Sequence, residues 1–194
     1  MARKETLKDG RKVVIKDLKM DDLGQLMDFY RSMPPEDRNY LRVDVTDEDV
    51  VRHRMKLMDT GCVFRIVALD GKRIVGDGAL ELSEEDWRQG QGELRVIVAK
   101  PYQHKGLGML MMRELTNLAM QKNIDRIIVK MARPQVAARK ICQRLGFREQ
   151  HVLPDYVRDR TGHRQDLIIM TCDIKELWQE MEHFYGDSDW QRCR

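Results

Sequence analysis

The feature that most constrains the fold is a strand-like segment that runs into a glycine-containing turn and then into a helical segment. Residues 92–99 read GELRVIVA, the most β-like run of the chain, and the turn that follows holds Gly106 and Gly108. Beyond it, apolar residues recur at helical spacing to about residue 122, which predicts an amphipathic helix. A strand, a tight turn and a helix in this order predict a β–α crossover unit within a sheet.

Such a turn favours the binding of an anion, because free backbone N–H groups and the helix dipole meet at a helix N-terminus. Glycines at positions 106 and 108 let an anion approach the backbone closely. The turn lacks the Gly-Lys-Ser/Thr ending of a P-loop, and Met111 stands where a dinucleotide fingerprint needs its third glycine. The residues alone leave two interpretations open, a pyrophosphate site or a corner without a ligand. Three preceding residues add side-chain hydrogen-bonding groups: Gln103, His104 and Lys105.

The rest of the chain alternates between strand-like and helical segments. The predicted strands are residues 12–18, 62–69, 73–82, 92–99, 126–131, 148–153 and 165–173. The predicted helices are residues 20–33, 46–60, 107–122, 134–145 and 175–185. Within the domain the order β-α-α-β-β-β-α-β-α-β-β predicts an α+β fold, with a mixed, mainly antiparallel sheet of six to seven strands flanked by helices. We predict one domain over residues 1–175, followed by a C-terminal helix and polar tail over residues 176–194.

Composition restricts the classes of function. The net charge is only +3, with basic and acidic residues interleaved, and this disfavours nucleic acid as a partner because duplex binding needs a clustered cationic surface. No apolar run reaches the roughly 20 residues that cross a bilayer, and the N-terminus has no signal-peptide core, so we predict a cytoplasmic protein without a membrane partner. The cysteines lack metal-ligand spacing, so we predict reduced thiols and no metal site. They are Cys62, Cys142, Cys172 and Cys193.

Two motifs resemble the GNAT superfamily of N-acetyltransferases. Gln103-x-x-Gly106-x-Gly108, after VIVAKPY and before a Leu/Met-rich helix, resembles motif A of that superfamily. Residues 133–147, which end in Leu-Gly-Phe, resemble its motif B. The order of the predicted elements is similar as well, so the resemblance covers about residues 12–174. In addition, residues 9–42 look like the start of the GNAT domain in bacterial protein lysine acetyltransferases.

The resemblance implies acetyl-CoA, or another acyl-CoA, as the cofactor. The pantetheine arm would pair like an extra strand with the backbone of Val96, Ile97 and Val98, because the neighbouring strand splays away in this family. The N–H of Val98 would meet the carbonyl oxygen of the acyl group. Gln135 stands where the family often has an asparagine, at the start of the motif B helix, and is expected to contact the cofactor. The pyrophosphate would lie on the amides of the turn residues Gln103, His104, Lys105, Gly106, Leu107, Gly108 and Met109.

Acetyl transfer to an amine benefits from a base, because an ammonium has no lone pair, and from a proton for the leaving thiolate. Glu93, at the start of the strand that would reach the thioester, is the predicted base; a solvent-facing glutamate is the alternative, and Glu81 is a second candidate. Cys142 stands where the family often has a tyrosine that supplies the proton. A catalytic thiol and a packed core thiol both fit that position. Tyr156 is another candidate donor.

The expected function is the transfer of an acetyl group from acetyl-CoA to a primary amine, and the resemblance of residues 9–42 favours a protein lysine. The acidic segment 83–87 and the late loop with Asp155, Arg158 and Asp159 are expected beside the acceptor. A small amine, such as a polyamine or an aminoglycoside, is an alternative acceptor. A non-catalytic acyl-CoA-binding regulatory module is the alternative function, because the family's tyrosine and asparagine are replaced here.

Overall fold

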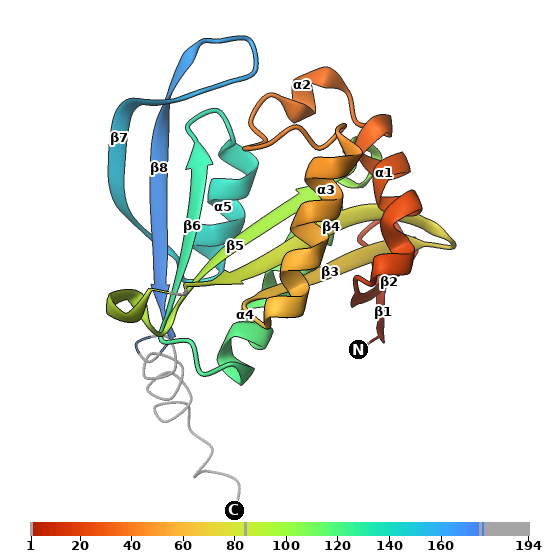
Figure 1. Ribbon diagram of the computed structural model, residues 1–194, viewed down its shortest axis with the longest axis horizontal. Coiled ribbons are helices and arrows are strands. Elements are labelled where there is room, and N and C mark those ends of the chain that lie inside the picture. Colours follow the sequence, from red (N-terminus) through yellow and green to blue (C-terminus); the bar gives the residue numbers. More distant parts are fainter. Residues whose placement is uncertain (1, 84, 175, 177–194) are drawn as a thin grey trace, which may run out of the picture.

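A single sheet runs through the computed structural model, which describes residues 2–83, 85–174 and 176 (Figure 1). The strand order among these residues is β1-β2-β3-β4-β5-β6-β8-β7. The strands are β1 (Ala2–Thr6), β2 (Lys12–Asp17), β3 (Val63–Asp70), β4 (Arg73–Leu82), β5 (Gln91–Val98), β6 (Arg126–Ala132), β7 (Arg148–Arg158) and β8 (Arg164–Asp173). The α-helices are α1 (Leu23–Ser32), α2 (Pro35–Arg38), α3 (Glu48–Lys56), α4 (Leu107–Gln121) and α5 (Val136–Arg144). Short 3-10 turns are η1 (Met20–Asp22), η2 (Leu57–Thr60), η3 (Asp86–Arg88) and η4 (Lys100–Tyr102).

The predicted α+β class and the mainly antiparallel sheet are confirmed. Among the described strands, β5 and β6 form the one parallel pair. The sheet has eight strands rather than six or seven, because β1 was not predicted from the sequence. This strand reads ARKET and is almost wholly exposed, so it lacks the apolar alternation that marks a strand. The helix predicted at residues 175–185 lies outside the described residues apart from residue 176.

Local chemistry explains where the helices begin and end. The carboxylate of Asp47 accepts hydrogen bonds from the N–H groups of Asp49 and Val50, at 2.9 and 3.4 Å, and this caps the N-terminus of α3. Helix α5 ends at Arg144, and Gly146, two residues later, has a left-handed φ of 83°. The following residue, Phe147, donates its N–H to the carbonyl of Cys142 at 3.0 Å. This turn is the Leu-Gly-Phe end of the motif B helix.

Two hydrophobic cores lie on opposite faces of the sheet. Helices α4 and α5 cover one face and α1 and α3 cover the other (Figure 1). Successive side chains of a strand point to opposite faces. Leu94 of β5 therefore packs in the α4/α5 core, while Ile97 packs against the α1/α3 core. By the same alternation, the side chains of Glu93 and Arg95 lie on the α1/α3 face. None of the described helices has the length and apolar character to cross a membrane.

Candidate active site

Strands β5 and β6 pair over three residues and then separate. Their parallel register joins Gln91, Gly92 and Glu93 of β5 to residues 126, 127 and 128 of β6. From Leu94 to Val98, the recorded strand pairing of β5 is with β4 only (Figure 1). Backbone groups of β5 that face β6 beyond Leu94 therefore have no partner in another described strand, and a polar backbone group needs one.

The hydrogen bonds at both ends of β5 show which backbone groups face the open side. The N–H of Ser83 donates to the carbonyl of Gln91 at 3.0 Å, and the N–H of Ala99 donates to the carbonyl of Val75 at 2.9 Å. Hydrogen-bonded and non-hydrogen-bonded pairs alternate along an antiparallel ladder. The odd-numbered residues from 91 to 99 consequently direct their N–H and C=O groups toward β4, and the even-numbered residues direct theirs toward the open side.

This alternation divides the three residues that we predicted to pair with pantetheine. The backbone of Ile97 is engaged with β4, whereas Val96 and Val98 present theirs to the open side. The carbonyl of Val98 already accepts a hydrogen bond from Nε2 of Gln103, at 3.1 Å. The N–H groups of Val96 and Val98 and the carbonyl of Val96 are therefore the groups that an extended ligand could reach.

The turn after β5 brings backbone N–H groups to the start of α4. Gly106, with φ of 94°, is the residue before the helix, and among the described residues no side chain caps the helix there. The N–H of Leu110 makes a helical bond to the carbonyl of Gly106 at 3.0 Å. The N–H groups of Leu107, Gly108 and Met109 precede that bond, and so they are the ones that an anion could meet.

The turn between β1 and β2 contacts and supports the turn that precedes α4. This support was not predicted from the sequence. The N–H of Lys8 donates to the carbonyl of Lys105 at 3.1 Å, and Nζ of Lys105 pairs with the carboxylate of Asp9 at 3.0 Å. The hydrogen bond from Lys105 lowers the pKa of Asp9. Arg11 lies 4.4 Å over the ring of Tyr102. The conformation of the turn therefore depends on a hairpin far away in the sequence.

Glu93 lies where β5 and β6 part, and two cations hold its carboxylate. Nζ of Lys130 donates to Oε2 at 2.8 Å, and Arg42 forms an ion pair with Oε1. Burial raises the pKa of Glu93, but the hydrogen bond from Lys130 and the charges of Arg42 and Lys130 outweigh burial, so the pKa lies below its ordinary value. The side chain is 15% exposed. An ionised carboxylate in this setting is a weak base, which is a constraint on the predicted role.

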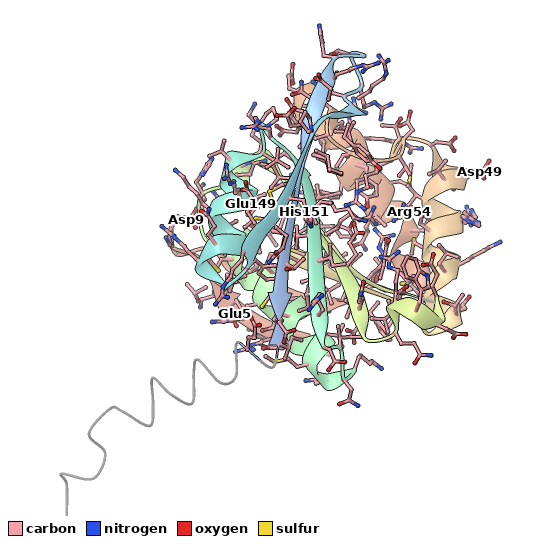
Figure 2. All side chains as sticks on the ribbon, turned by 90° about the vertical axis from the view of Figure 1, so that its left-hand side faces the viewer. Glu5, Asp9, Asp49, Arg54, Glu149 and His151 are labelled. Atoms are coloured by element: carbon pink, nitrogen blue, oxygen red, sulfur yellow. The ribbon has the colours of Figure 1, made fainter. Side chains whose placement is uncertain are left out.

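Glu81, the second candidate base, lies opposite Glu93 on the adjacent strand. Its Oε1 accepts hydrogen bonds from Arg54 of α3 and from Arg95 of β5, each at 2.5 Å. Figure 2, which views the molecule along the sheet, shows Arg54 and Asp9 on opposite sides of the strands. Arg54, which binds Glu81, therefore lies on the face of the sheet that carries α1 and α3, away from the turn before α4 that Asp9 supports.

The structure places Cys142 in the α4/α5 core with 2% exposure. Burial raises the pKa of its thiol to about 12, so the thiol stays protonated at neutral pH and reacts slowly as a nucleophile. These observations favour the alternative in which Cys142 is a packed core thiol rather than a catalytic one.

Gln135 is partly exposed at the start of α5, and its side-chain oxygen accepts the N–H of Ala132 at 2.9 Å. Its amide therefore links the end of β6 to α5.

The remaining candidates lie on exposed segments. Tyr156 is 66% exposed on β7, and Trp87 of the acidic segment is 84% exposed. The loop between β7 and β8 contacts the loop between α2 and α3, because Arg160 pairs with Asp44 at 2.7 Å. The N–H of Arg160 also donates to the carbonyl of Asn39 at 3.2 Å. These two loops meet over the end of the sheet where β5 and β6 are apart (Figure 1), and their roles beside an acceptor stay predictions.

The residues of this site fit acetyl-CoA. The uncapped start of α4 suits a pyrophosphate, and the unpaired edge of β5 suits an extended arm with amide groups. The description "Acetyltransferase (GNAT) family" belongs to a family model that matches residues 23–147, more than half of the chain. The chain belongs to the GNAT family of acetyltransferases. It is an N-acetyltransferase and uses acetyl-CoA.

Relatives of known name are consistent with this assignment. An acetyltransferase of Pseudomonas aeruginosa is 28% identical over 149 residues, which are 74% of this chain and 78% of the relative. The GNAT domain of PAT from S. lividans superposes with a TM-score of 0.75 at 14% identity, over 89% of this chain and 96% of that domain. Spermidine N-acetyltransferase from Vibrio cholerae, solved with CoA and spermine, superposes with a TM-score of 0.72 at 18% identity, over 86% and 98%.

Proposed function

We propose that the acceptor of this N-acetyltransferase is the side-chain amine of a lysine in a protein. The segment that resembles the start of bacterial protein lysine acetyltransferases, residues 9–42, supports this proposal. It contributes α1, α2 and Arg42, which pairs with Glu93 where β5 and β6 separate. In this proposal, the segment that carries the resemblance forms part of the acceptor side. A cytoplasmic location belongs to the same proposal.

In this proposal the chain holds the donor with its backbone. The N–H groups of Leu107, Gly108 and Met109 bind the pyrophosphate, and Val96 and Val98 align the pantetheine arm. Gln103 supports the arrangement indirectly, because its amide ties the turn to the carbonyl of Val98. Bound acetyl-CoA supplies the acetyl thioester.

The acceptor side has to deliver a neutral amine. We propose that Glu93 receives the proton of the acceptor ammonium through water. Two cations lower the pKa of Glu93, so a weak base of this kind needs an acceptor whose own pKa is lowered. Positive charges close to an ammonium lower its pKa, because they disfavour the charged form. Lys130 and Arg42, which hold Glu93, are such charges.

The test uses the purified protein with acetyl-CoA, a set of lysine-containing peptides and a set of small amines. We expect CoA release with peptides, and mass spectrometry should place the acetyl group on lysine side chains. CoA release with polyamines or aminoglycosides alone would contradict the protein-lysine proposal. Binding of acetyl-CoA without release of CoA for any amine would instead favour the non-catalytic module.

A further inference from the structure

A layer of charged side chains covers the α1/α3 face of the sheet where β5 and β6 separate, and we call it the charged layer. It joins strands that are neighbours in the sheet, because Glu81 and Glu93 are cross-strand partners. Arg95 follows Glu93 by two residues and shares its face. Arg54 reaches the layer from α3 (Figure 2). The members of the charged layer are Arg42, Arg54, Glu81, Glu93, Arg95 and Lys130.

Each carboxylate of the charged layer is shared by two cations. Arg54 and Arg95 both bond to Oε1 of Glu81 at 2.5 Å. Arg42 and Lys130 both pair with Glu93. Within the described part of the chain, four cations in this layer thus face two carboxylates, and an excess of two positive charges remains.

The pairs that border the layer do not cancel this excess. Arg65 and Asp77 form a buried one-to-one ion pair at 2.7 Å. Asp44 and Arg160 form another one-to-one pair at 2.7 Å. Burial lowers the pKa of Arg95, and the charges of Arg54 and Arg42 lower it further, whereas the carboxylates of Glu81 and Asp77 raise it.

The charged layer is accessible and lies beside the groups that would align the donor. The side chains of its four cations are between 23% and 37% exposed. Glu93 and Arg95 flank Leu94 on β5, and the open backbone of the strand begins at that point. An amine that approaches the open edge of β5 from the α1/α3 face therefore passes this layer.

We infer that the enzyme selects acceptor lysines that have an acidic residue as a near neighbour in the peptide. This inference rests on the proposed function, since it describes the peptide that the site takes. A carboxylate next to the acceptor lysine would occupy the excess positive charge. These ion pairs would hold the peptide so that the acceptor lysine lies beside the open edge of β5. A polyamine carries no carboxylate, so the excess cations of the charged layer would only repel it.

The experiment compares three peptides of the same length, each with a single lysine. The two neighbours of that lysine are glutamates in the first peptide, glutamines in the second and arginines in the third. At low ionic strength we expect kcat/KM to be about tenfold higher for the glutamate peptide than for the arginine peptide. Raising the salt concentration should reduce this ratio, because the groups are partly exposed and screened. Equal values, or a preference for arginine neighbours or spermidine, would overturn the inference.

A pair of variants assigns the preference to the charged layer. Arg54→Gln leaves Glu81 with one cation, so it should reduce the ratio between the glutamate and arginine peptides severalfold. Arg52→Gln is the matched control, because Arg52 lies on the same helix and pairs with the exposed Glu48. The control should keep the ratio of the unaltered protein. An unchanged ratio in Arg54→Gln would overturn the assignment.

Small amines separate this inference from the proposed function. If no peptide is acetylated, the protein-lysine proposal fails, and 6-aminohexanoate is then compared with hexylamine as acceptor. Faster acetylation of 6-aminohexanoate would support selection of an acceptor with a carboxylate. Faster or equal acetylation of hexylamine would overturn it, and turnover of no amine would overturn both statements.

Discussion

At the scale of single residues, Cys142 distinguishes a catalytic position from a core position. Its thiol is 2% exposed and has a pKa of about 12. Cys142→Ala should therefore leave kcat within about twofold and lower the free energy of unfolding by about 1 kcal/mol, because it removes buried volume. Activity assays and denaturant unfolding check both values.

Cys172→Ala provides the control for that substitution, since Cys172 is also buried, with 3% exposure. The two variants should lose similar amounts of stability and keep similar activity. A large loss of kcat in Cys142→Ala alone, at a temperature where the protein is fully folded, would restore the thiol as a catalytic group.

Glu93 is the residue on which the proposed chemistry depends most. If it receives the proton of the acceptor, Glu93→Gln should lower kcat on the order of 10²-fold, with little change in the affinity for acetyl-CoA. Glu149→Gln is a control, because Glu149 also pairs with an arginine, Arg139, at 2.5 Å. Unaltered kcat in Glu93→Gln would show that Glu93 only holds Arg42 and Lys130 in place.

The pH dependence of stability tests the ion pairs of Glu93. Its pKa in the folded protein lies below the ordinary value of about 4.5. A carboxyl group with a lowered pKa contributes stability above its unfolded pKa, and that contribution is lost as the pH falls through the folded pKa. Glu93→Gln should be about 2 kcal/mol less stable than the unaltered protein at pH 7. The difference should shrink below pH ~4, and a constant difference from pH 7 to pH 3 would contradict this account.

At the scale of elements, the turn between β5 and α4 depends on a left-handed glycine. Gly106 and Gly61 have φ of 94° and 75°, and an added Cβ would meet no closer atom than 3.7 Å at either position. Gly106→Ala and Gly61→Ala should thus carry a similar backbone strain, of about 1–2 kcal/mol. Only Gly106→Ala should weaken acetyl-CoA binding, by about tenfold, because it moves the N–H groups at the start of α4. Equal affinities of the two variants in calorimetry would argue against a pyrophosphate at this turn.

The elements also show how far the sequence could predict the site. The turn and the strand before it were predicted because glycines and apolar alternation are local signals. The separation of β5 and β6 was implied by the resemblance alone, since it depends on the register between strands whose paired residues, such as Gln91 and Arg126, are 35 positions apart in the chain. Strand β1 and the support of Lys105 by Asp9 could not be predicted, because their residues are polar and their contacts are far apart in the sequence.

Part of the charged layer could have been predicted from the sequence. Glu93 and Arg95 alternate along one strand, so their common face could have been predicted from the period of two. Arg42 and Arg54 come from a loop and a helix, and no local pattern relates them to Glu93 or Glu81. The acidic segment 83–87 was expected beside the acceptor, and that expectation stays a prediction; the cations of the charged layer were not foreseen.

At the scale of the whole molecule, the sheet separates two tasks. Helices α4 and α5 cover the face next to the turn that would hold the pyrophosphate, and α1 and α3 cover the face with the charged layer (Figure 1). The two sides meet at the open edge of β5, where Val96 and Val98 lie. In the proposed mechanism donor and acceptor would approach each other there, because the pairing of β5 with β6 ends at Glu93.

Amide hydrogen exchange along β5, with and without saturating acetyl-CoA, tests the central claim most directly. The account predicts fast exchange at Val96 and Val98 in the free protein, and at least tenfold slower exchange when acetyl-CoA is bound. Arg95 and Ile97 should exchange slowly in both states, because their N–H groups face β4. Equal protection of all four amides in the free protein, or no slowing at Val96 and Val98 on saturation, would contradict the account.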